Sequence, residues 1–164
     1  MSKQEAKQEL DYHKKEEEII KFLESKDNAI MVLATSDNDR VTARNVLIAN
    51  DGFDLYFFSW GQSRKCKQIR KNLKVALCKD DVQIEGVAEI LGGLLDENNK
   101  EYTDILKTRF PDSVEKWKNR PGMIIVRVQS RLIATAGKTI DDQIYIDYLD
   151  IENKTAYSEK WAHY

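Results

Sequence analysis

The pattern of apolar and polar positions changes several times along the chain. Lysine and glutamate alternate so densely at the start that residues 1–14 are expected to form a flexible arm or a solvated helix. Over residues 14–26, apolar side chains recur at helical spacing: Ile19, Phe22 and Leu23. We therefore expect a helix in this segment that covers one end of the domain.

Three strand-like runs follow within a short length of chain. The runs AIMVLATS, RVTARNVLIA and FDLYFFSW cover residues 29–36, 40–49 and 53–60. The breaks between them are DND at 37–39 and NDG at 50–52, residue types that tolerate the left-handed backbone of tight turns. Together these runs predict an antiparallel meander.

The third run carries apolar side chains on both faces of the strand. The two-residue period of a strand separates them into two sets. One set is Phe53, Leu55 and Phe57, and the other is Tyr56, Phe58 and Trp60. Both faces of this strand are therefore expected to be covered by other parts of the protein.

The second half of the chain mixes further strands with short helices. KVALCK and VQIEGVAEIL predict two strands around the DD turn at 80–81, and helical segments follow around Tyr102 and from Pro111. MIIVRVQSRLIATAG and QIYIDYLDI predict two more strands. Short antiparallel strands with a few interposed helices indicate a mainly β protein, built as a small closed or half-closed barrel and not as a doubly wound parallel sheet.

Length and charge limit the classes of protein that fit. A chain of 164 residues predicts a single domain over 1–164. The net charge of −2 argues against a protein that coats nucleic acid or anionic lipid. No apolar run reaches the roughly 18 to 20 residues of a membrane helix, and the charged start does not resemble a signal peptide. We expect a cytoplasmic protein with neither a nucleic-acid nor a membrane partner.

Cysteine and histidine offer little to a metal site. Cys66 and Cys78 lack the spacing of metal ligands, and we expect both to be ordinary buried or half-buried thiols. His13 and His163 lie near opposite ends of the chain, which leaves little for a histidine-based metal site or catalytic triad. No metal is therefore expected.

The segment at 63–72 predicts an amphipathic helix with an unusual first turn. Gly61 and Ser63 supply a turn and an N-cap, and Arg64 and Lys65 follow directly. Positive charge is unfavourable at a helix start because of the helix dipole, unless an anion is bound there. Free backbone N–H groups beside an arginine and a lysine form a typical phosphate site. The alternatives are a solvated basic face or a patch for nucleic acid.

The order of these motifs resembles a known family. VLATSDNDRVTARNVLI, then DLYFFSWGQSRKCKQIRKN, then VALCKDDVQIEGVAEI is similar to the pyridoxamine 5'-phosphate oxidase-like family of FMN-binding split barrels, especially its general stress protein branch. The resemblance covers about residues 15–92 well and the remainder loosely. It implies an antiparallel split β-barrel with peripheral helices and FMN as the cofactor.

The resemblance also implies which residues contact the flavin ring system. In the family, the strand matching ARNVLI lays its backbone along the ring, which assigns Arg44, Asn45, Val46 and Leu47 to FMN. The segment matching FSWGQSRK contributes Ser59 and Trp60 at a strand end. Trp60 could stack near the ring or partly block it. Trp117 and Trp161 are expected to be packing residues.

The FMN phosphate and the second subunit follow from the same resemblance. It assigns the phosphate to Ser63, Arg64 and Lys65, with Arg44 also able to reach it. An ordinary ion pair of Arg44 with a surface carboxylate is the alternative. The family's cofactor typically lies at a two-fold interface, so we expect a homodimer in which the partner chain completes each site.

The chain end separates this protein from one member of the family. Oxidases that act on pyridoxamine phosphate carry a C-terminal arginine and histidine motif, whereas this chain ends in YSEKWAHY. We therefore expect a flavin-dependent oxidoreductase or flavin reductase with another small substrate, and with a reduced nicotinamide as a possible donor. The alternatives are a non-catalytic flavin-binding or stress-response protein, and a relative in which haem, a deazaflavin or nothing replaces FMN.

Overall fold

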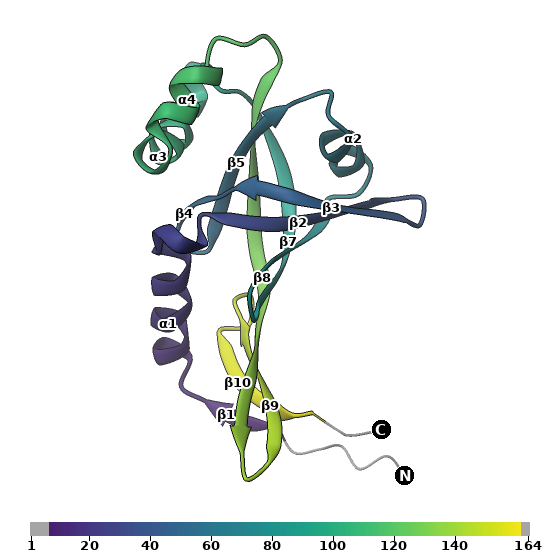
Figure 1. The fold of residues 1–164 in the computed structure, drawn as a ribbon, viewed down its shortest axis with the longest axis vertical. Helices are drawn as coiled ribbons and strands as arrows, with labels where there is room; N and C mark the ends of the chain where they lie inside the picture. Colours follow the sequence, from purple (N-terminus) through teal and green to yellow (C-terminus); the bar gives the residue numbers. More distant parts are fainter. Residues whose placement is uncertain (1–6, 162–164) are drawn as a thin grey trace.

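One long strand, β8 (Met123–Ile140), organises the sheet in the computed structural model, which describes residues 7–161 (Figure 1). Along one side it pairs with β7 (Val82–Gly93). Along the other side it pairs first with β5 (Asp54–Trp60) and then with β9 (Gln143–Asp150). The two halves of β8 therefore belong to different ends of the molecule, as Figure 1 shows.

The other strands extend the sheet in two directions. From β7 the order runs through β6 (Lys74–Lys79) and β2 (Ile30–Asp37) to β3 (Arg40–Leu47). From β9 it runs through β10 (Thr155–Lys160) to β1 (Gln8–Leu10), while β4 (Ala49–Asp51) pairs with β5. Every pair is antiparallel, and β3 and β5 are not paired within the described chain. The sheet stays open between them, which confirms the mainly β, split-barrel architecture.

The β2–β3 turn has the chemistry that the sequence predicted, and the β8–β9 turn, which the sequence analysis did not single out, is of the same kind. Asn38 and Asp39 both have positive φ, 46° and 63°, in the β2–β3 hairpin. Asp141 and Asp142 do the same between β8 and β9, at 48° and 58°. Asparagine and aspartate accept this left-handed backbone more readily than most residues, so the hairpins close with two-residue turns.

The main core fills the barrel and is closed at one end by α1 (Tyr12–Glu24). Ile19 and Leu23 are buried in it and Phe22 packs at its margin, which confirms the predicted stripe. The helix begins at its N-cap Asp11, whose side chain accepts a hydrogen bond from the N–H of Lys14 at 3.0 Å. None of the helices in residues 7–161 is long and apolar enough to cross a membrane.

A second core lies on the opposite face of β5. The helices α3 (Lys100–Arg109) and α4 (Pro111–Trp117) cover Tyr56, beside two short 3₁₀ turns, η1 (Lys26–Asn28) and η2 (Glu97–Asn99). Both faces of β5 are thus covered, as predicted. Trp60 is the exception, because its side chain at the strand end is 55% exposed.

Four expectations need correction. Residues 8–10 form β1 on the edge of β10, where we expected an arm or a helix over 1–14; residues 1–6 lie outside the described part. The run at 40–49 is two strands, because the N–H of Ile48 leaves the ladder and donates to the carbonyl of Ala29 at 2.8 Å. Cys78 is exposed, since it points away from the core. Trp161 is 56% exposed and does not pack.

Candidate functional site

The turn before α2 (Arg64–Lys71) presents backbone donors to its surroundings. Ser63 is the N-cap residue, as predicted, but its side chain makes no capping hydrogen bond. Its Oγ lies 3.3 Å from the Oγ of Ser59, which is itself buried at the end of β5. Within residues 7–161, no acceptor bonds the N–H groups of Arg64, Lys65 or Cys66. The start of α2 therefore retains three donors for a ligand.

Arg44 reaches from β3 towards this helix start. Its Nη1 donates to the carbonyl of Leu33 at 3.1 Å and to Oγ1 of Thr35 at 2.7 Å, and its Nη2 contacts Oγ1 of Thr42. Partial burial lowers the pKa of Arg44, and the nearby charge of Arg64 lowers it further. The guanidinium is thus held in place by neutral acceptors beside another cation.

Lys65 and Arg64 complete a cluster of three cations with Arg44. Burial lowers the pKa of Lys65, and Arg44 lowers it again, although the Cys66 side chain opposes this shift. No carboxylate of the described chain forms an ion pair with any of the three. The expected alternative, an ion pair of Arg44 with a surface carboxylate, does not occur in this part of the protein. Such a cluster favours an anion.

Gln68 fastens α2 to the hairpin that carries Arg44, and the sequence analysis missed it. Its Oε1 accepts hydrogen bonds from Thr35 and Thr42, both at 2.7 Å, and its Nε2 donates to the carbonyl of Arg40 at 3.2 Å. The side chain is buried, at 5% exposure. The signal in the sequence was a single uncharged polar residue within a run of lysine and arginine.

The later cations of α2 have structural partners on the exposed side of the helix. Nη1 of Arg70 donates to the carbonyl of Gly61 at 2.6 Å and so holds the turn that starts the helix. Lys71 forms an ion pair with Asp37 at 2.8 Å. Arg70 is therefore a structural residue, whereas Lys67 is exposed and belongs to the solvated face of the helix.

The pleat of β3 separates the other predicted site residues from the cations. Arg44 faces α2 and Val46 is buried in the main core. Asn45 and Leu47 point to the opposite side of the strand, where they line a surface with Ile30 and other residues. Their side chains do not meet the cluster within one chain. The backbone of β3 does border it, because β3 is an edge strand that pairs only with β2 in the described chain.

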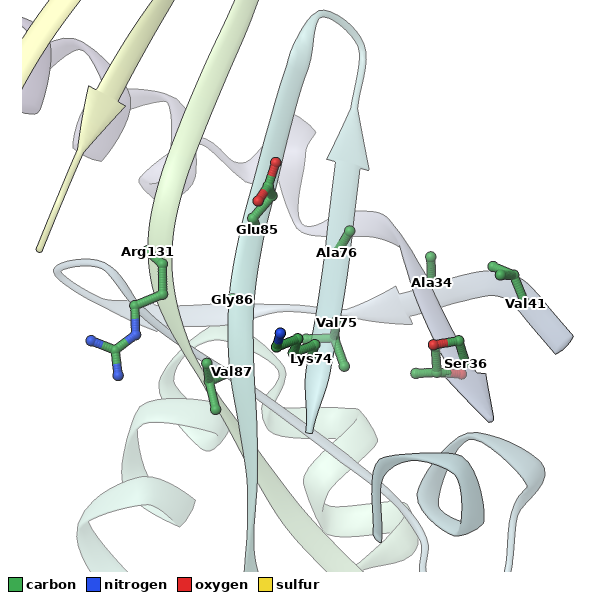
Figure 2. Close-up of a pocket in the computed structure, with 11 residues that line it drawn as sticks. Ala34, Ser36, Val41, Lys74, Val75, Ala76, Glu85, Gly86, Val87 and Arg131 are labelled. Atoms are coloured by element: carbon green, nitrogen blue, oxygen red, sulfur yellow. The ribbon is translucent and has the colours of Figure 1, made fainter. Parts of the chain in front are cut away.

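The outer face of the sheet is unusually apolar for an exposed surface. Val41 is 68% exposed, Ile30 51% and Val32 38%. A groove of about 430 Å³ crosses this face, and its lining comes from five neighbouring strands, β3, β2, β6, β7 and β8 (Figure 2). Figure 2 shows the small side chains of Ala34 and Ala76 on neighbouring strands, with Arg131 towards one side of the groove and Val41 towards the other.

The sequence profile of the family described as pyridoxamine 5'-phosphate oxidase matches residues 16–149. The chain belongs to this family. The match spans the chain from within α1 almost to the end of β9, which leaves out β1 and β10, so the resemblance of the three motifs is confirmed at the level of the family. No curated protein matches the chain in sequence.

Solved structures of the pyridoxamine 5'-phosphate oxidase type share the fold. General Stress Protein 26 from Bacillus anthracis is 23% identical, with a TM-score of 0.56 over 72% of this chain and 90% of that chain. A FAD-binding protein from Mesorhizobium loti is 18% identical, with a TM-score of 0.57 over 71% and 89%. The haem storage protein HutZ from Vibrio cholerae is 13% identical, with a TM-score of 0.55 over 70% and 89%.

Proposed function

We propose that the protein is a cytoplasmic FMN-binding flavoprotein whose phosphate site is the start of α2. The observation that carries this proposal is the cluster of Arg44, Arg64 and Lys65, which no carboxylate of the described chain neutralises. Ser63 adds a hydroxyl, and the helix start adds free N–H groups. A phosphate monoester accepts hydrogen bonds from all of these groups.

The ring system of the flavin would lie along β3 and the end of β5. The backbone of residues 44–47 is available there because β3 is an edge strand, and Ser59 and Trp60 close the other side. The FAD-binding relative from Mesorhizobium loti supports a flavin in this fold. FMN supplies the redox chemistry when it is bound, and the residues of this chain bind it and orient it.

The outer face supports a homodimer with the cofactor at its interface. Exposed apolar side chains of β2 and β3, Ile30, Val32 and Val41, lose their contact with water when a second copy covers them. Asn45 and Leu47 lie on this same face. In such a dimer, β3 would bind the phosphate through Arg44 on one face and contact the partner subunit through Asn45 and Leu47 on the other.

The proposed activity is that of an FMN-dependent oxidoreductase or flavin reductase. Steady-state oxidation of NADH or NADPH with FMN present tests this, and turnover above that of free FMN is expected. FMN that binds without turnover would place the protein among non-catalytic flavin-binding or stress-response proteins. The visible spectrum of the purified protein separates a bound flavin from a bound haem.

Replacing the two cations of the first helical turn tests the phosphate site. A charge-assisted hydrogen bond contributes about 1.5 to 3 kcal/mol, so we expect Arg64→Ala with Lys65→Ala to weaken FMN by about 100-fold. Riboflavin lacks the phosphate and should change by less than about threefold. Titration of protein fluorescence with both ligands measures the effect.

Lys67→Ala is the matched control, because Lys67 lies on the same helix and is exposed. It should leave the affinities for FMN and riboflavin unchanged. Equal losses for both ligands in the double variant would instead indicate damage to the ring site or the fold.

A further inference from the structure

A second pocket lies where β5 ends, beside the proposed flavin site. Trp60, Trp117, Arg120 and Met123 line it, and its volume is about 450 Å³. Pockets for small ligands typically measure about 300 to 1,000 Å³. Trp60 and Met123 face each other across the β5–β8 ladder, and the other two residues come from the end of α4 and the loop after it.

The backbone at Gly122 lies against the indole of Trp60. The N–H of Gly61 donates to the carbonyl of Gly122 at 2.8 Å, which ties the end of β5 to the loop. Gly122 has φ of +82°, and a Cβ there would lie only 3.1 Å from Nε1 of Trp60. The positive φ favours glycine at this position, and the absence of a Cβ leaves room for the ring. Trp60 is 55% exposed, so part of its ring is accessible to a ligand.

The opposite wall of the pocket is positively charged. The guanidinium carbon of Arg120 lies 5.0 Å from the ring centroid of Trp117, and Nζ of Lys116 lies 5.1 Å from it. Neither cation forms an ion pair with a carboxylate in the part of the chain that the structure describes. The pocket thus combines aromatic faces with unneutralised positive charge.

We propose that this pocket binds a planar aromatic anion. Trp60 offers an exposed aromatic surface for stacking, and Met123 offers a polarisable side chain that adapts to a ring. Arg120 is available to a carboxylate, sulfonate or phosphate group on that ring. Trp60 also belongs to the proposed flavin site, so the bound anion would lie next to the flavin as its substrate. This last step rests on the proposed function, whereas the binding itself does not.

Calorimetric titration of the full chain with 2-naphthoate tests the binding, without added FMN. Its neutral counterpart is 2-naphthamide, and cyclohexanecarboxylate keeps the charge but lacks the aromatic plane. If the aromatic surface and the positive charge both contribute, 2-naphthoate binds at least about tenfold more tightly than 2-naphthamide or cyclohexanecarboxylate. Equal affinities for 2-naphthoate and 2-naphthamide, or no binding of 2-naphthoate, would overturn the proposal.

Two variants with matched controls assign the binding to this pocket. Stacking on an aromatic side chain contributes roughly 1 to 3 kcal/mol, so Trp60→Ala is expected to weaken 2-naphthoate about tenfold. Trp161→Ala, at an equally exposed tryptophan elsewhere, should have no effect. Arg120→Gln should weaken 2-naphthoate about tenfold but not 2-naphthamide, and Arg131→Gln should change neither. Losses in the control variants as large as these would contradict the assignment.

A competition experiment separates this inference from the proposed function. Binding of 2-naphthoate that persists at saturating FMN supports a distinct pocket, whereas displacement by FMN shows that the pocket belongs to the flavin itself and overturns the inference. If 2-naphthoate binds with the expected variant pattern and FMN does not bind at all, the pocket stands and the proposed function fails.

Discussion

Lys65 shows how burial and neighbouring charge act together on one side chain. Both lower its pKa below the ordinary 10.5, and burial and the charge of Arg64 likewise lower the pKa of Arg44. Each positive charge therefore disfavours the protonated form of the neighbouring side chains while no anion is present. A bound phosphate would reverse this effect, because opposite charge favours the protonated form.

This arrangement predicts a pH dependence of FMN affinity. The charge of Lys65 is present below its pKa and is lost as the pH rises through that value, which lies below 10.5. FMN affinity should therefore decline in the alkaline range at a pH where an ordinary lysine would still keep its proton. Fluorescence titrations between neutral pH and pH 10 measure the decline. Lys65→Arg should flatten the profile, and riboflavin should not follow it. An unaltered profile in Lys65→Arg would contradict the role of Lys65.

The sequence predicted the cations of the site but not the residue that positions them. Arg64 and Lys65 stand out because they occupy a helix start after a turn. Gln68 does not stand out in the sequence, because hydrogen bonds to residues far away in the chain, such as Thr35, leave no periodic pattern. The opposite directions of Arg44 and Asn45 do follow from the two-residue period of a strand.

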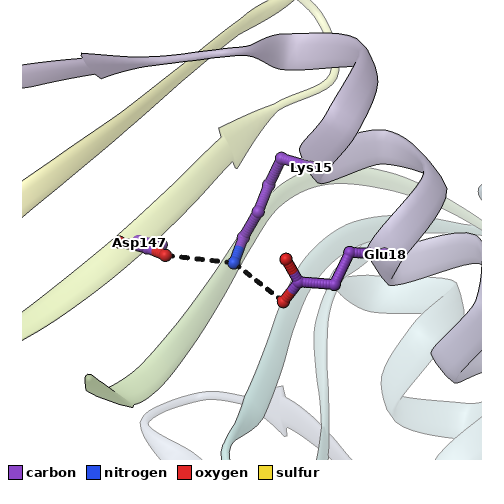
Figure 3. A network of polar contacts seen from close by, with 3 residues as sticks. All are labelled: Lys15, Glu18 and Asp147. Carbon is purple, nitrogen blue, oxygen red and sulfur yellow. Dashed lines mark hydrogen bonds and ion pairs between the residues drawn. The ribbon is translucent and has the colours of Figure 1, made fainter.

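At the scale of elements, a buried ion pair joins α1 to β9. Nζ of Lys15 lies 3.1 Å from Oδ2 of Asp147 and 3.0 Å from Oε1 of Glu18 (Figure 3). Lys15 and Asp147 are only 7% and 8% exposed, and Oδ1 of Asp147 has no hydrogen-bond partner. Removing one partner from such a pair leaves a buried charge without compensation.

Lys15→Met should therefore lower the free energy of unfolding by about 3 to 5 kcal/mol, measured by urea denaturation. Lys15→Met together with Asp147→Leu should recover most of this loss, because neither charge remains. The control is Lys100→Met, which breaks the exposed pair with Asp104 and should cost no more than about 1 kcal/mol. A double variant no more stable than Lys15→Met would rule out the uncompensated charge as the cause.

Helices and strands could be predicted from the sequence where a clear apolar pattern was bounded by turn residues. Alternation bounded by asparagine and aspartate located the β2–β3 hairpin, and β5 showed its two covered faces by the uninterrupted apolar run at residues 55–58. The strand β1 carries no such pattern. Its three residues, Gln8–Leu10, form a strand because the edge of β10 offers free backbone groups.

At the scale of the whole molecule, the outer face predicts the oligomer. Val41 lines the groove and is 68% exposed, so a charge there would be buried against a second copy. We expect the wild type to sediment as a dimer and Val41→Glu to weaken the dimer at least about tenfold. Leu95→Glu is the control, at an exposed apolar residue outside the groove. A monomeric wild type that still holds flavin would refute the interface.

Cysteine labelling gives an independent measurement of the same interface. Cys78 is exposed on the outer face, where it faces Val32 across the β2–β6 pair, and Cys66 is buried. Reaction of Cys78 with a thiol reagent should therefore slow as protein concentration rises through the dimerisation range. A labelling rate that does not depend on concentration would count against the interface.

The long strand β8 has a consequence for the order of folding. The cation cluster and its support come from one continuous stretch, since Arg44, Thr35 and Gln68 lie within β2, β3 and α2. The end of β5 is different, because Trp60 pairs with Met123, far along the chain. Distant pairings form late, since a long loop must close first. During synthesis, the cation cluster can therefore assemble before β8 leaves the ribosome, whereas Trp60 gains its strand partner only afterwards.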